Sequence, residues 1–173
     1  MKVLAFSASN NSQSINKQLA TYAASLVVDA EVEIIDINDY ELPIFSQDRE
    51  AELGQPALAK SFFEKIGEAD AVIISFAEHN GTYTAAYKNL FDWLSRINTK
   101  VFQDKAVVYL STSPGPGGAQ SVLTSAVNSA QYFGANVKGH LSVPSFNDNF
   151  DVTTQKLSNQ DLDKALRQII ALL

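Results

Sequence analysis

The residues best suited to binding chemistry form a polar segment near the start of the chain, Ser-Ala-Ser-Asn-Asn-Ser-Gln-Ser-Ile-Asn over residues 7–16. The segment contains no acidic or basic residue, and an apolar stripe at helical spacing follows it. The first turn of the helix that this stripe predicts should therefore present free backbone N–H groups to the segment. Hydroxyl donors beside a helix start bind phosphate without a formal charge. Capping of the helix by Ser12 or Ser14 accounts for one polar residue, but not for Ser7, Ser9, Ser12, Ser14 and Asn16 together. The segment therefore predicts a phosphate site.

Two further segments have the composition of ligand-binding loops. In the first, Glu78 to Thr84, the pair Asn80-Gly81 is typical of a hairpin. The apolar stripe that follows, Tyr87, Leu90 and Leu94, argues for a helix instead. The second segment, Ser113 to Ala119, holds three glycines and two prolines. Glycine lets backbone approach a flat ligand closely, and proline stiffens that approach.

Several common catalytic motifs are absent. The chain has no Gly-Lys pair for a Walker loop, no glycine in its first loop for a dinucleotide turn, and no G-x-S-x-G nucleophile motif. His79 and His140 have no spacing to acids that matches a metal site. Lys88 and Asp92, one helical turn apart, indicate a surface ion pair, and Trp93 a core or interface residue. We predict no catalytic side-chain pair and no metal.

These segments must be positioned by the elements between them. Strand-like and helix-like segments alternate five times, which predicts an α/β fold of three layers, with a parallel sheet between two layers of helices. The expected strands are Lys2–Ser7, Glu31–Ile37, Ala71–Ala77, Lys105–Thr112 and Asn136–Val143. The expected helices carry the stripes that begin at Ile15, Leu58, Tyr83, Val122 and Leu162.

The strand patterns predict the order of the sheet. The first, third and fourth strands are nearly continuous apolar runs, as in strands buried on both faces, whereas the second and fifth alternate, as edge strands do. This pattern fits the flavodoxin-like order 2-1-3-4-5. Ligands of such sheets bind outside the carboxyl ends of the strands, where the order reverses. The three polar or glycine-rich segments all follow strands that meet there.

Composition narrows the functional classes. The chain has 173 residues and no cysteine, which excludes disulfides, thiolate zinc sites and a cysteine nucleophile. Its formal charge is −6, from 13 Lys+Arg and 19 Asp+Glu, without a basic run. We therefore expect neither nucleic-acid binding nor a membrane contact. A single domain over residues 1–173 and a cytoplasmic location are expected.

Three motifs resemble those of the NADPH-dependent FMN reductase family, which includes quinone-, chromate- and azo-reducing members, from Lys2 to about Val143. The family pattern G-S-x-R-x-x-S-x-N corresponds to Ala8–Asn16, and P-E-Y-N-[GH]-[ST] to Ala77–Thr82. The latter is followed by Lys88-Asn89 and Asp92-Trp93, which match the family's trailing L-K-N-x-I-D-W. The third pattern, S-P-G-x-x-G-G, corresponds to Ser113–Gly118.

The resemblance implies an FMN-dependent oxidoreductase that takes hydride from NADPH or NADH and reduces a small-molecule acceptor. It implies that FMN phosphate is lined by Ser9, Asn11, Ser14, Ile15 and Asn16. It implies that the isoalloxazine is contacted by Glu78, His79, Asn80 and Gly81 and flanked by Ser113, Gly115 and Gly118. It also implies a homodimer or homotetramer, with the apolar segment Leu42–Phe45 near the interface.

Three positions depart from the family patterns: Asn11 replaces an arginine, Ala77 a proline and His79 a tyrosine. Loss of a charged phosphate contact costs about 1.5–3 kcal/mol, so FMN should bind more weakly than with arginine. Two alternatives stay open. One is a flavodoxin-like electron carrier or FMN-binding regulatory module without its own NAD(P)H oxidation, and the other is a degenerate member that binds no flavin.

Overall fold

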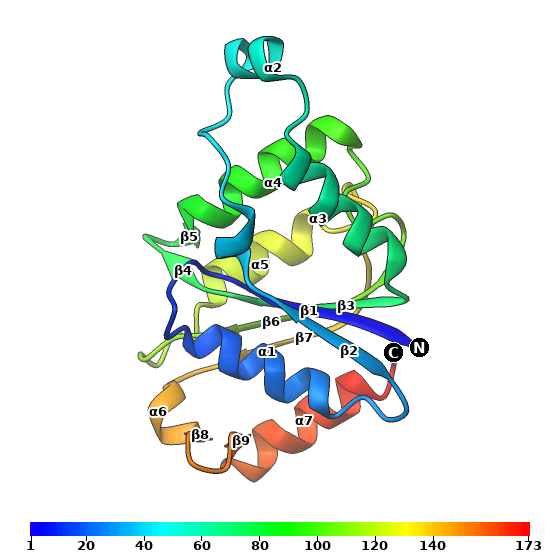
Figure 1. Ribbon diagram of the computed structural model, residues 1–173. Helices are drawn as coiled ribbons and strands as arrows, with labels where there is room; N and C mark the ends of the chain where they lie inside the picture. Colours follow the sequence, from blue (N-terminus) through cyan, green and yellow to red (C-terminus); the bar gives the residue numbers. More distant parts are fainter.

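The computed structural model describes residues 1–173, and a five-stranded parallel sheet forms its centre (Figure 1). The strand order is β2-β1-β3-β6-β7, which confirms the predicted order. All four strand pairings are parallel. The bounds are β1 Lys2–Ala8, β2 Glu31–Ile35, β3 Ala71–Phe76, β6 Ala106–Thr112 and β7 Asn136–Val143.

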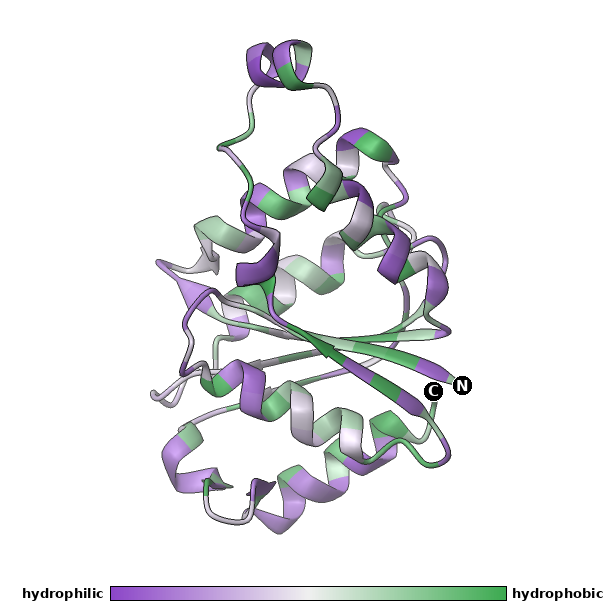
Figure 2. Cartoon of the chain, in the orientation of Figure 1, coloured by the Kyte–Doolittle hydropathy of each residue, from purple (hydrophilic) through white to green (hydrophobic).

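Helices cover both faces of the sheet (Figure 1). One face carries α3 (Ala57–Glu68), α4 (Ala85–Ile97) and α5 (Gln120–Ser129), and the other carries α1 (Ile15–Ser25) and α7 (Gln160–Ile170). The apolar core is accordingly divided into clusters of 24 and 16 buried residues. Successive residues of β1 enter opposite clusters, which explains its continuous apolar run (Figure 2).

The second strand ends two residues earlier than expected, at Ile35. Asp36 then caps a short 3-10 helix, η1 (Ile37–Tyr40), by accepting a 2.9 Å hydrogen bond from the Asn38 amide. Its other oxygen lies 2.6 Å from Lys17 Nζ. Burial alone would raise the pKa of Asp36, but the hydrogen bonds from Lys17 and Asn38 outweigh burial and lower the pKa.

The prediction that excluded a hairpin at Asn80-Gly81 was wrong. Strands β4 (Glu78–His79) and β5 (Thr82–Tyr83) pair antiparallel across these two residues. Asn80 has φ 53° and Gly81 φ 80°, the left-handed conformation that a tight hairpin requires. The expected helix forms as well, because the hairpin is complete before α4 begins.

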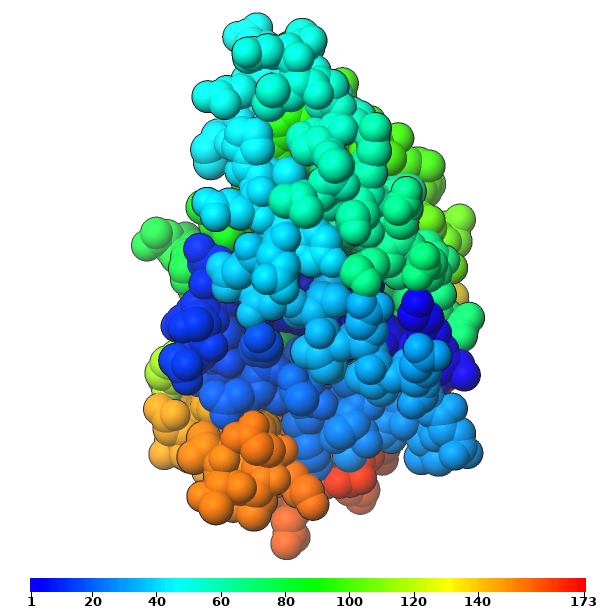
Figure 3. All heavy atoms as spheres, viewed as in Figure 1, coloured from blue at the N-terminus to red at the C-terminus, as the bar shows by residue number.

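Four more elements were missed because their apolar patterns are short. They are α2 (Gln47–Leu53), α6 (Phe146–Asn149) and the paired strands β8 (Phe150–Asp151) and β9 (Lys156–Leu157). Helix α2 has no buried residue and stands off the body of the molecule (Figures 1 and 3). It belongs to a segment that we call the arm, residues 41–55.

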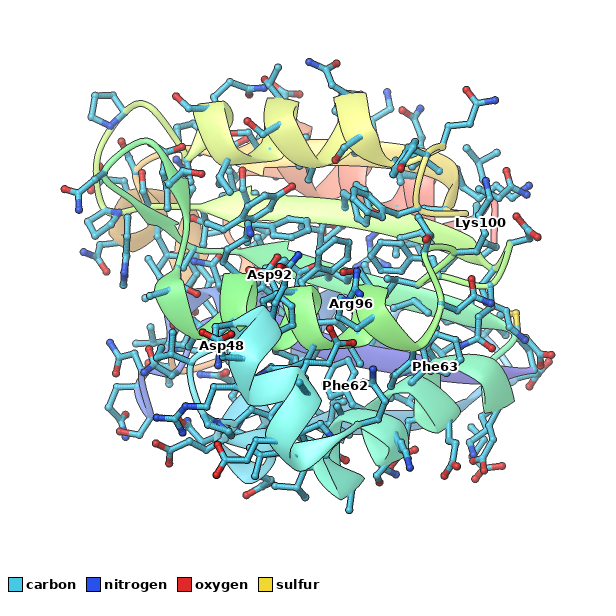
Figure 4. The ribbon with its side chains drawn as sticks, turned by 90° about the horizontal axis from the view of Figure 1, so that it is seen from above. Asp48, Phe62, Phe63, Asp92, Arg96 and Lys100 are labelled. Atoms are coloured by element: carbon cyan, nitrogen blue, oxygen red, sulfur yellow. The ribbon has the colours of Figure 1, made fainter.

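The arm is held to α4 mainly through its backbone. The Asn89 side chain donates to the carbonyls of Leu42 and Pro43 at 3.0 and 3.2 Å and accepts from the Phe45 amide at 2.8 Å. Trp93 Nε1 donates to the Pro43 carbonyl at 2.8 Å, and the Trp93 side chain is fully buried, as expected. Further along, α2 crosses above α4 near Arg96, whose Nε lies 3.0 Å from a Glu50 oxygen (Figure 4).

The two helices on the other face are joined by a polar triad. Tyr22 of α1 donates to the Asp163 carboxylate of α7, while Arg167 contacts the second Asp163 oxygen at 2.7 Å and the Tyr22 hydroxyl at 3.0 Å. Burial would raise the pKa of Asp163, but the hydrogen bonds from Tyr22 and Arg167 outweigh burial, so the pKa is lowered.

The ion pair expected on α4 also forms, with Lys88 Nζ 2.6 Å from Asp92 Oδ1.

Not one of the helices combines the length and the apolar character needed to cross a membrane.

Candidate functional site

Three loops follow the carboxyl ends of the adjacent strands β1, β3 and β6, so they lie side by side at one edge of the sheet (Figure 1). We call them the serine loop (residues 8–16), the hairpin loop (77–84) and the glycine loop (113–119). They are the three segments singled out in the sequence. The sheet thus brings them together at the point where the strand order reverses.

The serine loop folds on its own side-chain oxygens. Ser9 Oγ accepts from the Asn11 amide at 3.2 Å, Asn11 Oδ1 from the Gln13 amide at 2.9 Å, and Ser14 Oγ from the Lys17 amide at 3.2 Å. In each bond the oxygen is the acceptor, so the two hydroxyl hydrogens and the Asn11 side-chain NH2 stay free to donate. Ser14 is the N-cap of α1, and capping by Ser12 or Ser14 was one of the roles predicted from the sequence.

Helix α1 adds backbone donors to the same loop. The amides of Ile15 and Asn16 begin the helix and therefore have no carbonyl one turn earlier within it. Lys17, the nearest basic side chain, is paired with Asp36. An anion at this loop would be held by neutral donors and by the positive end of the α1 dipole.

The side chain of Asn16 does not face the loop. It is 2% exposed and turned toward the sheet, where its Nδ2 donates to the Thr112 carbonyl at 3.1 Å. Its Oδ1 accepts from the Thr112 amide at 3.0 Å and from the Ser75 hydroxyl at 2.7 Å. Asn16 therefore ties the start of α1 to the ends of β3 and β6, and only its backbone N–H is available to an anion.

The hairpin loop presents its tip to solvent. His79, Asn80 and Gly81 are exposed, but the Glu78 carboxylate is not directed at the tip. Its Oε2 accepts a 2.9 Å hydrogen bond from the amide of Val122, in the first turn of α5. Of the four hairpin residues expected to contact a ligand, His79, Asn80 and Gly81 are therefore exposed at the tip, whereas the Glu78 side chain is turned toward α5.

Thr84 fixes the base of the hairpin loop, and the sequence reasoning missed it. Its hydroxyl donates to the Ala8 carbonyl at 3.0 Å and accepts from the Tyr87 amide at 3.2 Å, and its exposed fraction is 1%. Thr84 thus joins the start of α4 to the end of β1. The available signal was a threonine directly before a helical stripe.

The glycine loop packs down on the neighbouring strands. Gly118 is buried at φ 58°, and a Cβ there would lie 2.2 Å from Ser142 Oγ. Its carbonyl accepts from the hydroxyls of Ser111 and Ser142 at 2.7 and 2.8 Å. Gly118 therefore supports the loop rather than lining its surface. Gly115, by contrast, faces open space, with no atom within 4 Å of a Cβ.

A cluster of buried aromatic rings lies beneath the hairpin loop. Phe76 contacts the rings of Tyr83, Tyr87 and Tyr109 at centroid distances of 5.7, 5.5 and 5.3 Å. Burial raises the pKa of Tyr87 and of Tyr109 well above the ordinary phenol value. These phenols therefore stay neutral across the physiological pH range and do not supply a base.

The surface cavities lie at different distances from the three loops. One of about 350 Å³ lies beside the serine loop, and one of about 280 Å³ opens between Asn10, the residues after β2 and the start of α4. The largest, about 510 Å³, is lined by Lys100, Asp104 and the start of β7, away from all three loops. No group of three or more histidine or acidic side chains is placed to hold a metal.

Comparison with known proteins shows the family of the chain. The family model described as NADPH-dependent FMN reductase matches residues 1–148. An NADPH:quinone oxidoreductase of Arabidopsis thaliana is 33% identical over 125 residues, which cover 70% of this chain and 62% of that protein. A 2-hydroxy-1,4-benzoquinone reductase of Burkholderia sp is 33% identical over 120 residues, covering 68% and 63%. The chain thus spans less than two thirds of the length of these relatives.

Among solved structures, FerB from Paracoccus denitrificans, a flavoenzyme NAD(P)H:(acceptor) oxidoreductase, superposes with a TM-score of 0.76. The two are 22% identical, and the match covers 98% of this chain and 93% of FerB. At that identity the likeness concerns the fold.

Proposed function

The chain belongs to the NADPH-dependent FMN reductase family, and we propose that it binds FMN at the three loops and passes hydride from NADH or NADPH to small acceptors such as quinones. In this proposal residues 1–173 act as a single FMN-binding domain. The observation that carries it is the serine loop at the switch point of the sheet, where the Ser9 and Ser14 hydroxyls and the Asn11 side chain serve only as acceptors and keep their N–H and O–H groups free to donate. The backbone N–H groups of Ile15 and Asn16, at the start of α1, add two further donors.

The donor set fits a phosphate monoester. We assign the phosphate to Ser9, Asn11 and Ser14 through their side chains, and to Ile15 and Asn16 through their backbone N–H groups. The exposed hairpin tip, His79 to Gly81, and the glycine-loop residues Ser113 and Gly115 would hold the ring system. The open space at Gly115 supports this placement, because a flat ligand can approach the backbone there.

Bound FMN supplies the hydride chemistry, and the protein supplies position and electrostatics. The chain's contribution is a rigid frame: Asn16, Thr84 and Gly118 fix one loop each to the strand ends beneath. The buried tyrosines below the hairpin exclude water and remain neutral. A general acid or base is not needed in this scheme.

An absorbance and kinetic experiment tests the proposal. The purified protein is titrated with FMN, and oxidation of NADH and of NADPH is followed with 1,4-benzoquinone and FMN in excess. Free FMN without protein corrects for the uncatalysed reaction. We expect saturable FMN binding and protein-dependent oxidation of at least one nucleotide.

Each other outcome is informative. Binding of FMN without nucleotide oxidation would favour an electron carrier, a role that the net charge of −6 would suit at a partner surface. Absence of FMN binding would refute the proposed cofactor. Ser9→Ala should weaken FMN binding, whereas Ser125→Ala, on the exposed surface of α5, removes a hydroxyl outside the loops and should not.

We further propose a cytoplasmic homodimer or homotetramer that uses the arm. Ile44 is 76% exposed and Leu53 49% exposed, although both are apolar. Leu58, at the start of α3, is also exposed. Apolar side chains gathered on a projecting segment favour burial against another surface. Sedimentation velocity measures the assembly directly, and a monomer at micromolar concentration would refute it.

A further inference from the structure

Helix α5 starts without a cap of its own. The residue at its N-cap position is Ala119, which has the left-handed φ of 59° and no side-chain hydrogen bond. The first turn of the helix contains no acidic residue. Helix starts normally obtain both a hydrogen-bond acceptor and favourable negative charge from such residues.

Glu78 supplies both from a different loop. Its carboxylate accepts from the amide of Val122, the third residue of α5, although the two residues are 44 positions apart. This is the hydrogen bond that links the hairpin loop to the start of α5. Since the glycine loop runs directly into α5, the same bond joins the hairpin loop to the glycine loop.

We propose that Glu78 is a positioning residue that makes the hairpin loop and the glycine loop one mechanical unit. Its carboxylate also keeps a negative charge between these two loops. The proposal rests on the proposed function in one respect, since these two loops are assigned there to hold the FMN ring system.

The hydrogen bond of Glu78 and its negative charge have different effects, and substitutions can separate the two. Loss of the hydrogen bond should let the hairpin and the first turn of α5 open independently, in the protein alone. Loss of the charge should favour the reduced over the oxidised cofactor, because a nearby negative charge opposes the gain of electrons. Glu78→Gln keeps an acceptor oxygen and removes the charge, whereas Glu78→Asp keeps the charge and is one methylene too short for the bond.

Hydrogen exchange of the protein without FMN tests the mechanical part. We expect Glu78→Ala and Glu78→Asp to lower amide protection at least tenfold in residues 78–83 and 120–123 together, with the rest of the sheet unchanged. Glu78→Gln should keep most of the protection. Glu52→Ala, at an exposed position of α2 and outside both loops, is the matched control. Unchanged protection in both Glu78→Ala and Glu78→Asp, or loss in only one segment, would overturn the coupling whether or not the protein binds FMN.

The potential of bound FMN tests the electrostatic part. In Glu78→Gln the dissociation constant of reduced FMN should fall at least tenfold relative to that of oxidised FMN, which equals a shift of about 30 mV toward more positive potential. Glu78→Asp should not shift the potential in that direction. An unchanged potential in Glu78→Gln would refute the electrostatic role, whereas failure of the unaltered protein to bind FMN would refute the proposed function instead.

Discussion

Replacing Asn16 with alanine should destabilise the protein more than any other single change in the serine loop. The side chain is 2% exposed and makes three hydrogen bonds, to Ser75 and to both backbone groups of Thr112. Ser75 and Thr112 are themselves buried, so water does not replace the lost partner. The Ser75 hydroxyl can rotate to another acceptor, but the N–H and C=O of Thr112 cannot. At about 1–3 kcal/mol for each buried unsatisfied group, the expected loss is roughly 3–4 kcal/mol.

Urea unfolding followed by circular dichroism measures this loss, and the slope with denaturant should not change. For a chain of this size, the predicted loss corresponds to a fall in Tm of roughly 6–16 °C. Asn11→Ala is the matched control, because Asn11 is exposed and its oxygen accepts only from the Gln13 amide. A loss below about 1 kcal/mol in Asn16→Ala, or an equal loss in Asn11→Ala, would show that the buried amide is not the tie inferred here.

Four further predictions concern the other parts of the molecule. Gly118→Ala should cost about 2 kcal/mol or more from left-handed strain and the close approach of β7, whereas Gly117→Ala, whose Cβ meets no atom within 4 Å, should cost far less in the same unfolding assay. Asn11→Arg should tighten FMN binding by about 1.5–3 kcal/mol by fluorescence titration, and unchanged affinity would place this position away from the phosphate. Ile44→Asp should shift the protein toward monomer in sedimentation velocity, with no change in its circular dichroism. Because the pKa of Asp163 is lowered in the folded state, its stabilisation is present above the unfolded value of about 3.9 and is lost as the pH falls through the folded value. Asp163→Asn should therefore unfold more easily at pH 7, and the difference should narrow on acidification below about pH 4.

The sheet was predictable because a strand buried on both faces is apolar throughout, whereas a strand buried on one face alternates apolar and polar residues. Continuous apolar runs marked β1, β3 and β6, and alternation marked the edges β2 and β7, which together specified the order. The elements that escaped prediction are held by few side chains. Helix α2 buries no residue, and the β4–β5 hairpin is only two residues long on each side. Neither is long enough to show a period.

The location of the candidate site could be predicted from the sequence, but the orientation of each side chain in it could not. Strand order brings the three loops together whatever residues they carry. Composition did not reveal that Asn16, Glu78 and Gly118 face inward while their neighbours face the surface. Asparagine, glutamate and glycine suit a ligand and a buried tie equally well. The difference is set by a partner far along the chain, such as Thr112 for Asn16.

The attachment of the arm has an evolutionary consequence. Asn89 and Trp93 hold main-chain atoms of residues 42, 43 and 45, and these hydrogen bonds do not depend on the side chains at positions 44 and 47–53. As far as folding is concerned, residues 44 and 47–53 are thus free to diverge, whereas Phe45 packs its ring against Trp93 at a centroid distance of 5.1 Å. A library that randomises residues 44 and 47–53 should retain folded members at high frequency, whereas one at residues 89 and 93 should not. Substitutions at these positions can therefore change the exposed surface of the arm during evolution while the fold of the domain is kept.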